Sequence, residues 1–351
     1  MIGKQEIIIT TEIKGILKEL FTSKKYTKIG VLVDENTRTH CYPLIIDSLP
    51  KHNVFEIKSG EEEKELSTCE QIWLEMTNAH FDRNSLLINL GGGVIGDMGG
   101  FCASTFKRGI EFINLPTTLL SQVDASVGGK LGIDFHGFKN HIGVFQEPRM
   151  VLIDPTFLET LDPRELRSGF AEVIKHSLIR DKTHWLELTQ KELSQHDWSK
   201  IIEHSINIKK SVVASDPLEN GLRKILNFGH TIGHAIESYY LKIKGKRLLH
   251  GEAIAIGMIA ESFLSEEKLS LSKNELIDIQ EFIIKIFGAP KIDNGDLEKI
   301  VQLTYQDKKN TGKIINGTLL SAVGSAEFDI PLQPKEIEGG LKYYQELTNK
   351  N

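Results

Sequence analysis

Strand-like and helix-like segments alternate along the first 154 residues of the chain and then stop alternating. In this first part, short runs rich in β-branched residues are separated by longer amphipathic runs such as residues 63–79. The short runs predict buried strands over residues 28–34, 54–58, 85–90, 111–115 and 150–154. Such an alternation predicts a mainly parallel sheet covered by helices.

Strand signals nearly vanish beyond Asp154. Helical patterns cover residues 161–180, 198–214, 223–240, 251–268, 273–287 and 297–306, with one strand or hairpin near residues 312–322. We therefore expect an α/β N-terminal domain over residues 1–154 and a mostly α-helical C-terminal domain over residues 155–351. Because ligands of open parallel sheets bind at the carboxyl ends of the strands, we expect the active site in the cleft between these domains.

A glycine-rich loop follows the third predicted strand. Gly91, Gly93 and Gly96 have the spacing G-x-G-x-x-G, in which glycine lets the backbone approach a pyrophosphate at the start of a helix. The loop predicts a Rossmann-like dinucleotide site, although glycine clusters also close ordinary strand-to-helix turns. Glu111 is a candidate for the ribose-binding acid of such sites, but its position at the start of a strand favours a surface charge.

Two histidines lie four residues apart on one predicted helix face, His230 and His234, and His250 opens the next helical run. This spacing is typical of a divalent-metal site. Glu172 and His176 have the same spacing on an earlier predicted helix. Because a catalytic metal prefers three protein ligands and an open position, the spacing alone leaves the choice among these residues open.

Two further clusters of polar residues suit anion binding. Arg223, Asn227, His230 and His234 are spaced four, three and four apart, which predicts one polar stripe along a single helix. Burying such a stripe in a core helix would cost free energy unless its polar side chains bind a partner or ligand, so the stripe indicates a site. The second cluster lies in the glycine-rich stretch 106–144 and suits capture of a phosphate or carboxylate. Its members are Lys107, Arg108, Asp124, Lys130, Lys139 and Asn140.

Charge and cysteine content exclude several classes of protein. Lys and Arg number 42 against 48 Asp and Glu, and the net charge of −6 argues against a nonspecific nucleic-acid or membrane-surface binder. The three cysteines, Cys41, Cys69 and Cys102, are too widely spaced for a disulfide framework or a cysteine metal knot. No apolar run approaches membrane length without a charge. We therefore expect a cytoplasmic enzyme with a small-molecule partner, no nucleic-acid partner and no membrane partner.

Several long motifs together resemble the 3-dehydroquinate synthase family of sugar-phosphate cyclases: residues 91–97, 116–130, 169–175, and 226–234 followed by 249–252. The resemblance runs from about residue 34 to residue 309. It implies the conversion of 3-deoxy-D-arabino-heptulosonate 7-phosphate to 3-dehydroquinate and phosphate, a lyase reaction of the shikimate pathway to chorismate and the aromatic amino acids. It also implies bound NAD and one divalent zinc or cobalt ion, and we expect a homodimer.

The resemblance assigns roles to individual residues of this chain. The metal ligands are expected to be Glu172, His230 and His250. Proton transfer and control of the departing phosphate are expected of His234, Glu219, Lys130, Lys175, Asn140 and Arg108. Further substrate contacts are expected from Asp124, Lys209, Arg223, Asn227 and one of Lys308 or Lys309. Contacts with NAD are expected from Asp34, Asn36, Glu61, Lys64, Gly92, Gly93, Asp97, Thr117, Thr118, Lys139, Phe157 and Thr160.

Two departures from the family pattern stand out. Phe138 precedes the Lys139-Asn140 pair where the family commonly has glycine, and the linker from His234 to His250 looks somewhat long. The alternatives are another cyclase such as a 2-deoxy-scyllo-inosose synthase, a metal-dependent alcohol dehydrogenase, and a noncatalytic NAD sensor. Arg223 with Asn227 and Lys209 favours a substrate that carries a carboxylate. The many candidate phosphate-binding lysines argue against the dehydrogenase, and the open metal position with His234 argues against the sensor.

Overall fold

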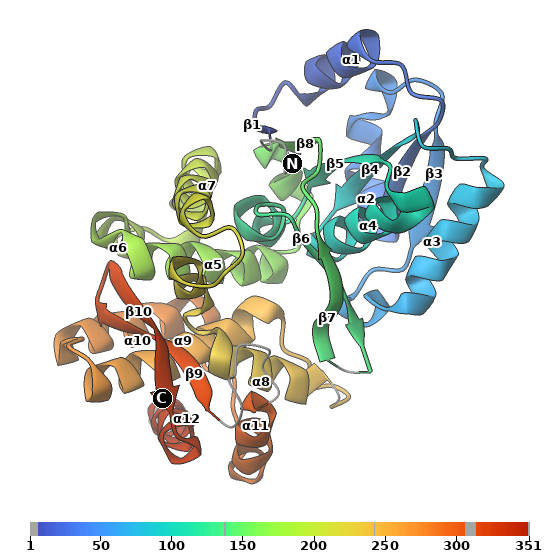
Figure 1. Cartoon of the computed structure of the whole chain (residues 1–351). Coiled ribbons are helices and arrows are strands. Elements are labelled where there is room, and N and C mark those ends of the chain that lie inside the picture. Colours follow the sequence, from blue (N-terminus) through green and yellow to red (C-terminus); the bar gives the residue numbers. More distant parts are fainter. Residues whose placement is uncertain (1–5, 137, 242, 306–313, 350–351) are drawn as a thin grey trace. The chain divides into compact units, whose positions relative to one another are not determined.

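The computed structural model describes residues 6–136, 138–241, 243–305 and 314–349 (Figure 1). It divides into two compact units, the first comprising Met1–Leu166 with Trp198–Ile206 and the second Arg167–Asp197 with Asn207–Asn351. Helices α5 (Pro163–Arg180) and α7 (Trp198–Ser215) therefore contribute residues to both units. The domain boundary that the sequence pattern places after Asp154 stays a prediction.

Six parallel strands form the sheet of the first unit. Their order is β1 (Glu6–Ile9), β8 (Met150–Ile153), β5 (Glu111–Pro116), β4 (Leu86–Gly91), β2 (Ile29–Asp34) and β3 (Asn53–Ile57). Five of these strands confirm the five strands predicted from the sequence. The sixth, β1, is not predicted by the sequence pattern. The direction in which successive strands are added reverses between β2 and β4. The next strand after β2 is β3, on one side of the pair, whereas the next strand after β4 is β5, on the other side. Open parallel sheets bind their ligands at such a reversal.

Apolar layers cover both faces of this sheet. On one face, α3 (Leu66–Asn78) and α4 (Gly93–Thr105) pack against a layer that includes Leu32 of β2. On the other face, α1 (Ile13–Ser23) packs against a layer that includes Val31 and Val33. Successive residues of a strand point to opposite faces, so burial on both sides explains why the strands are apolar at nearly every position.

A two-stranded antiparallel hairpin follows the fourth helix in the first unit. It consists of β6 (Lys130–Phe135) and β7 (Phe138–Phe145), and it lies in the stretch that the sequence marks only as glycine-rich. Leu131 and Ile133 join the core that α3 and α4 form with the sheet. A short α-helix, α2 (Glu35–His40), follows β2.

Helices dominate the second unit. They are α6 (Lys182–Thr189), α8 (His230–Leu241), α9 (His250–Lys268), α10 (Lys273–Phe287), α11 (Leu297–Thr304) and α12 (Pro334–Asn349), joined by an antiparallel hairpin of β9 (Ile315–Ala322) and β10 (Ser325–Leu332). Helix α9 is buried along most of its length, where α8, α10, α12 and β9 pack against it. Together with the parallel sheet, this unit confirms the predicted fold class. No helix in the described part of the chain combines the length and the apolar composition that crossing a bilayer requires.

The single helix predicted over residues 223–240 is wrong. The segment forms a 3-10 helix, η8 (Leu222–Asn227), and then a separate helix α8 that begins at His230. Gly229 lies between them with a φ of +78°, a left-handed conformation that ends one helix before the next begins. The predicted polar stripe is therefore split, because Arg223 and Asn227 lie on η8 while His230 and His234 lie on α8.

Candidate active site

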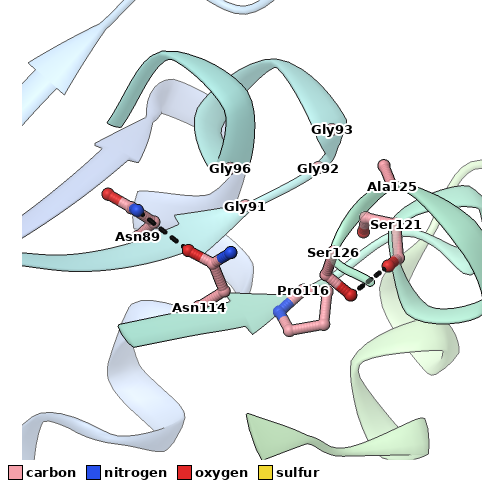
Figure 2. Close-up of a pocket in the computed structure, with 10 residues that line it drawn as sticks. All are labelled: Asn89, Gly91, Gly92, Gly93, Gly96, Asn114, Pro116, Ser121, Ala125 and Ser126. Carbon is pink, nitrogen blue, oxygen red and sulfur yellow. Dashed lines mark hydrogen bonds between the residues drawn. The ribbon is translucent and has the colours of Figure 1, made fainter. Parts of the chain in front are cut away.

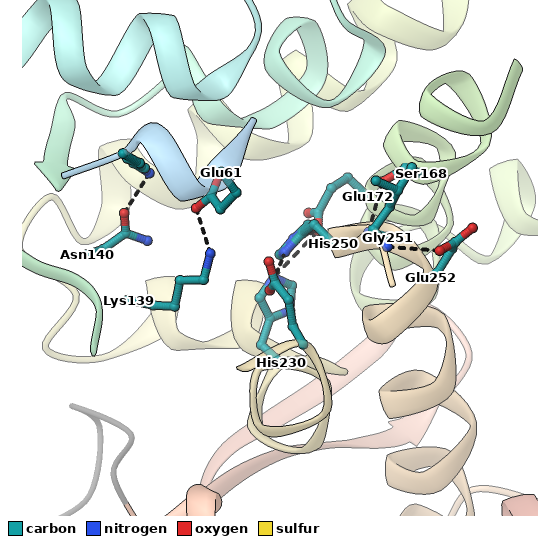
Figure 3. A network of polar contacts seen from close by, with 12 residues as sticks. Glu61, Lys139, Asn140, Ser168, Glu172, His230, His250, Gly251 and Glu252 are labelled. Carbon is teal, nitrogen blue, oxygen red and sulfur yellow. Dashed lines mark hydrogen bonds and ion pairs between the residues drawn. The ribbon is translucent and has the colours of Figure 1, made fainter. Parts of the chain in front are cut away.

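Three side chains of the second unit converge on one point. They are Glu172 on α5, His230 at the start of α8 and His250 at the start of α9 (Figure 3). Nε2 of His230 lies 3.4 Å from Oε1 of Glu172, and Nε2 of His250 lies 3.5 Å from the same oxygen. Among the described residues, that buried oxygen accepts no hydrogen bond.

These separations fit three ligands of one metal ion. They are longer than good hydrogen bonds, which lie at about 2.7–3.2 Å. Tetrahedral zinc has bonds of about 2.0–2.1 Å, which place neighbouring ligand atoms about 3.4 Å apart. The residues Glu172, His230 and His250 therefore fit a divalent ion. Sequence spacing could not select this set of ligands, because His250 lies on α9 whereas His230 and His234 lie on α8.

The second ring nitrogen of each histidine is held by an acceptor. Nδ1 of His230 lies 3.0 Å from the carbonyl oxygen of Phe228. Nδ1 of His250 lies 3.1 Å from Oε2 of Glu237. A carbonyl oxygen and an ionised carboxylate both act only as acceptors, so both Nδ1 atoms carry a proton and Nε2 is the atom that each ring can offer to a metal.

Charges around the three residues differ from one side chain to the next. Burial, aided by the positive charge of Lys175, lowers the pKa of His230 to about 4, so this ring is neutral as a metal ligand must be. Burial also disfavours the charged form of His250, but Glu237 and Glu172 outweigh it and raise the pKa of His250 to about 10. Burial disfavours the charged form of Glu172 as well, yet Lys175, which donates to its Oε2, and His230 hold the pKa of that carboxyl well below its usual range. A bound ion would take the place of the proton on Nε2 of His250.

A second set of donor atoms overlaps the first and comprises His234, Glu237 and His250. The ring of His234 lies 4.9 Å from the ring of His230 and 5.8 Å from that of His250, measured between centroids. Glu237 already accepts a hydrogen bond from His250, whereas Oε1 of Glu172 has no such partner among the described residues. The first set is therefore the better metal site, and His234 lies beside it.

A close approach of α5 to α9 places Glu172 next to His250. The N–H of Gly251 donates to Oγ of Ser168 at 2.9 Å. A Cβ atom on Gly251 would lie only 1.9 Å from the carbonyl oxygen of Ser168, so no larger residue fits there. Ser168 lies one helical turn before Glu172, and Gly251 follows His250 directly.

A buried carboxylate fixes the start of α8 and with it His230. Glu261 on α9 accepts the N–H of Gly229 at 2.6 Å and the N–H of Ile232 at 3.0 Å. Helix N-termini have N–H groups without intrahelical partners, and a negative charge is favourable at that end. At Gly257 a Cβ atom would lie 2.0 Å from the carbonyl oxygen of Gly229, so α8 and α9 also touch through glycine.

The loop before η8 holds the predicted carboxylate-binding arginine. The carboxylate of Asp216 accepts backbone N–H groups from Asn220 at 3.0 Å, Gly221 at 2.6 Å and Arg223 at 3.1 Å. The side chain of Arg223 is buried, and its Nη1 donates to the carbonyl oxygen of Pro217 at 2.7 Å. The guanidinium group is therefore held in place before any substrate arrives.

Two other predicted residues of this unit are joined to each other. Nδ2 of Asn227 donates to Oε1 of Glu219 at 3.0 Å. Lys209 is buried on α7. Lys308 and Lys309 lie outside the residues that the structure describes.

Left-handed backbone occurs at three of the predicted catalytic residues. The φ angles are +69° at Arg108, +48° at Asn140 and +61° at Glu219. This conformation is uncommon for residues other than glycine, and residues held in it cluster at functional sites. A positive φ also occurs at residues without a predicted catalytic role, such as His80 and Asp329, so it is compatible with function at these three positions but does not identify them.

The glycine loop of the first unit borders a hollow (Figure 2). Strand β4 ends at Gly91 and α4 begins at Gly93, with the intervening Gly92 as the helix N-cap. A Cβ on Gly91 would lie 2.5 Å from Cβ of Ile95, whereas one on Gly96 would meet no atom within 4 Å. Packing therefore requires glycine at 91, while Gly96 leaves open space beside the helix N-terminus, where an anion is favoured.

Asn89 and Asn114 line the same hollow, and sequence reasoning missed both (Figure 2). Nδ2 of Asn89 donates to Oδ1 of Asn114 at 2.9 Å, between adjacent strands β4 and β5. An asparagine in the middle of an otherwise mainly apolar strand is the signal that could have identified them, because a buried amide needs a partner.

A charged network joins several of the predicted cofactor residues. Nζ of Lys64 donates to Oδ2 of Asp97 at 2.5 Å and to Oδ1 of Asn140 at 2.7 Å. Nζ of Lys139 donates to Oε1 of Glu61 at 2.7 Å (Figure 3). Burial disfavours the charge on Lys64, but Asp97 and Glu61 outweigh it and raise the pKa of this lysine.

The remaining predicted cofactor residues lie on several elements of the first unit. Asp34, at the end of β2, caps α2 by accepting the N–H of Thr37 at 2.7 Å. The N–H of Thr117 donates to the carbonyl of Gly91 at 3.0 Å. Phe157 is buried in the core, whereas Asn36 and Thr160 are exposed. Thr118 is half-buried, and its Oγ1 lies 2.9 Å from Oγ of Ser121.

The predicted substrate residues of the first unit differ in exposure. Arg108 is exposed on a 3-10 turn (Phe106–Arg108). Asp124 is half-buried in a π-helical turn (Ser121–Ala125), and Lys130 is half-buried at the start of β6. Glu111 accepts hydrogen bonds from Tyr26 at 2.8 Å and Arg149 at 3.1 Å, which confirms its interpretation as a strand charge near the surface.

The first unit has a parallel sheet with a glycine loop, and the second, helical unit has a Glu-His-His cluster. These features define an α/β protein of the dinucleotide-binding class with a candidate metal centre. The family models for the N-terminal and C-terminal domains of 3-dehydroquinate synthase match residues 54–168 and 169–310. The 3-dehydroquinate synthase of Parabacteroides distasonis is 40% identical over 349 residues, which cover 98% of this chain and 99% of that protein. The chain belongs to the 3-dehydroquinate synthase family.

Two solved structures share the fold. The 2-epi-5-epi-valiolone synthase of Streptomyces hygroscopicus, with NAD+ and Zn2+ bound, superposes with a TM-score of 0.86 at 24% identity and covers 98% of this chain and 97% of its own. A 2-deoxy-scyllo-inosose synthase in complex with carbaglucose-6-phosphate, NAD+ and Co2+ gives a TM-score of 0.84 at 24% identity, covering 96% of each chain. These likenesses show a common fold.

Proposed function

We propose that the chain is a carbon-oxygen lyase that converts 3-deoxy-D-arabino-heptulosonate 7-phosphate to 3-dehydroquinate and phosphate. The observation that carries the proposal is the convergence of two histidine Nε2 atoms on one unsatisfied oxygen of Glu172, in a chain that belongs to this family. Relatives of 40% identity over nearly the whole chain have the same activity in their names.

The proposed cofactors are NAD and one zinc or cobalt ion, as in the two cyclases of similar fold. Glu172, His230 and His250 would hold the ion, since their donor atoms already have the separations of metal ligands. When bound, the ion acidifies substrate hydroxyls and NAD accepts and returns a hydride, so NAD is regenerated in each turnover.

The proposed NAD site lies at the reversal of the parallel sheet. Asp34 ends β2 and Gly91 ends the adjacent β4, so the carboxyl ends of both strands meet at the place where such sheets bind nucleotides. Gly92 and Gly93 start α4, whose N-terminal N–H groups suit a pyrophosphate. The charged network of Glu61, Lys64, Asp97 and Lys139 would exchange some of its internal hydrogen bonds for contacts with the nucleotide.

We propose that three cations and one side-chain amide of the chain assist the elimination step. Phosphate leaves with its negative charge, and Lys130, Lys175, Arg108 and Asn140 would stabilise that charge by charge-assisted hydrogen bonds. Lys175 donates to Oε2 of Glu172 and balances its negative charge. With Glu172 serving as a metal ligand, the ammonium group of Lys175 would be available to a substrate anion.

Recognition of the substrate carboxylate is proposed for Arg223, assisted by Lys209 and Asn227. A buried guanidinium held by the carbonyl of Pro217 has a fixed direction, which suits a planar carboxylate. Asp124 and one of Lys308 or Lys309 are proposed as further substrate contacts.

Proton transfer is proposed for two residues of the second unit. His234 lies beside the ligand rings, and Glu219 is held by Asn227 in a left-handed conformation. The homodimer and the cytoplasmic location expected from the sequence stay predictions.

One incubation separates this function from its alternatives. The protein loaded with zinc or cobalt and NAD is mixed with the heptulosonate phosphate, and inorganic phosphate and NADH are measured together. Phosphate release without net NADH is the expected result. Accumulation of NADH without phosphate would indicate an alcohol dehydrogenase, and no reaction of either kind would indicate a noncatalytic binder. Turnover of glucose 6-phosphate in place of the heptulosonate would indicate an inosose-type cyclase.

A further inference from the structure

Glu237 is a carboxylate beside the candidate metal ligands to which the proposed reaction gives no role. It lies on α8 seven residues after His230, which puts both side chains on one face of that helix. Only 10% of its side chain is exposed, and its Oε2 lies 3.1 Å from Nδ1 of His250. A buried charge in this position needs a partner, and the imidazole of His250 is one.

We propose that Glu237 is a positioning residue for the metal site: it accepts the Nδ1–H of His250 and thereby directs Nε2 of that ring at Oε1 of Glu172. The inference rests on the metal site of the proposed function. Carboxylates that accept from the second nitrogen of a metal-binding histidine fix both its tautomer and its ring orientation.

His250 depends on such a partner more than His230 does. The side chain of His250 is 25% exposed against 11% for His230, so packing restrains its ring less. His250 is also the first residue of α9, where the hydrogen bond from Leu249 N–H to Glu252 fixes the backbone but not the ring. The ring of His230 is held instead by the main-chain carbonyl of Phe228.

Glu237 also places a second negative charge near the ion. Glu172 shares its charge with Lys175, which donates to its Oε2. A carboxylate bonded to Nδ1 makes the imidazole a more basic ligand. Removal of the carboxylate should therefore weaken metal binding by two routes, through the free rotation of the ring and through the loss of its negative charge.

Two substitutions separate these routes. Glu237→Gln keeps the size and an oxygen that can accept from Nδ1, but removes the charge. Glu237→Leu keeps a similar volume and removes both. Glu267→Gln, the same chemical change on the exposed side of α9, serves as the matched control. The readouts are the zinc dissociation constant, measured by competition with a chromophoric chelator, and the visible absorption spectrum of the cobalt-loaded protein.

We expect Glu237→Leu to weaken zinc binding by about 10-fold to 100-fold and to change the cobalt spectrum. Glu237→Gln should weaken zinc binding by less than the leucine variant and keep the cobalt spectrum of the wild type. Glu267→Gln should match the wild type in both. Zinc affinity and a cobalt spectrum equal to wild type in Glu237→Leu would overturn the inference. So would complete loss of zinc binding in Glu237→Gln, because Glu237 would then be a ligand itself.

The glutamine variant decides the matter if Glu237→Leu does not fold. Glu237→Gln keeps the acceptor for Nδ1 of His250, so a cobalt spectrum equal to that of the wild type supports the positioning role, and a changed spectrum in this variant contradicts it. Failure of the proposed reaction is a separate result. In that case the wild-type protein releases no phosphate, while the wild type, Glu237→Gln and Glu237→Leu still bind zinc with affinity decreasing in that order. A wild type that binds no zinc would overturn the metal site and this inference together.

Discussion

The N–H of Gly251 donates to the hydroxyl of Ser168 at 2.9 Å, and this contact joins the two helices that carry Glu172 and His250. Gly251 has no side chain, and the hydroxyl oxygen of Ser168 accepts this hydrogen bond. Their importance is geometric, because the closeness of the two backbones sets the distance between a ligand on α5 and a ligand on α9.

Gly251→Ala is expected to damage stability and metal binding together. The new Cβ would lie 1.9 Å from the carbonyl oxygen of Ser168, a backbone atom that cannot rotate away. Overpacking of this kind costs about 1–3 kcal/mol or more in the free energy of unfolding. Urea denaturation and zinc titration measure the two effects.

The control for this prediction is Gly339→Ala on α12, where a Cβ would meet no atom within 4 Å. Replacing glycine by alanine inside a helix stabilises it by about 0.5–1 kcal/mol, so this variant should be as stable as the wild type or slightly more stable. Equal stability of both variants would show that α5 and α9 can separate at Gly251 without penalty.

His230→Ala is expected to remove both the metal and the activity. Purified wild type should bind about one divalent ion per chain, and two remaining ligands are too few to hold an open catalytic site. Elemental analysis and phosphate release are the measurements. His176→Ala should be far milder, and a metal-free His176→Ala protein would favour the ligand set built from Glu172 with His176.

Lys130→Ala and Arg108→Ala are expected to impair the handling of substrate while leaving NAD affinity nearly unchanged. Loss of a charged hydrogen bond to an anion costs about 2–5 kcal/mol, which lowers kcat/KM by an order of magnitude or more. Steady-state rates and NAD titration are compared for each variant. Equal loss in both measurements would place these side chains in the cofactor site.

Gly96→Ala is expected to separate folding from cofactor binding. A Cβ at this helical position meets no protein atom within 4 Å, so the unfolding free energy should be unchanged or slightly higher. The same methyl group occupies space beside the glycine loop, and NAD affinity should fall. Gly91→Ala is the contrasting variant, because its Cβ would lie 2.5 Å from Cβ of Ile95 and should destabilise the protein itself. An NAD affinity equal to that of the wild type in Gly96→Ala would place the nucleotide elsewhere.

Arg223→Lys is expected to lose most of the activity on the heptulosonate phosphate, although it keeps the positive charge. A lysine cannot make the planar two-pronged contact that a guanidinium makes with a carboxylate. Rates are measured for wild type and variant on this substrate and on glucose 6-phosphate, which lacks the carboxylate. Wild-type turnover of glucose 6-phosphate that does not respond to the substitution would favour an inosose-type cyclase and leave the metal and NAD sites unaffected.

The sheet could be predicted because its strands are buried on both faces. A largely apolar composition is a signal that a sequence carries locally, and β2, β4, β5 and β8 show it, whereas the edge strand β3 includes Asn53 and Glu56. The hairpin of β6 and β7 contains several glycines and lacks this signal. The break before α8 depends on Gly229, where a Cβ would come within 2.5 Å of the Met258 side chain, and a contact so distant in the sequence leaves no local pattern.

The candidate site could be predicted only in part for the same reason. The spacing of His230 and His234 predicts a metal site, but only His230 converges with Glu172 and His250. The choice depends on where α9 begins relative to α8, which is a property of helix packing. Glu237 contacts His250 once across that packing and Glu261 accepts two N–H groups near the start of α8, and no local sequence pattern predicts these contacts.

The placement of the three candidate ligands on three different helices ties the ion to the native state. An unfolded chain holds Glu172, His230 and His250 far apart, so it competes poorly for zinc, and the ion binds almost entirely to the folded protein. The thermal midpoint should then rise with free zinc concentration. If the chain binds zinc in this way, we expect metal supply to change how often the protein unfolds, and with it the rate of its degradation.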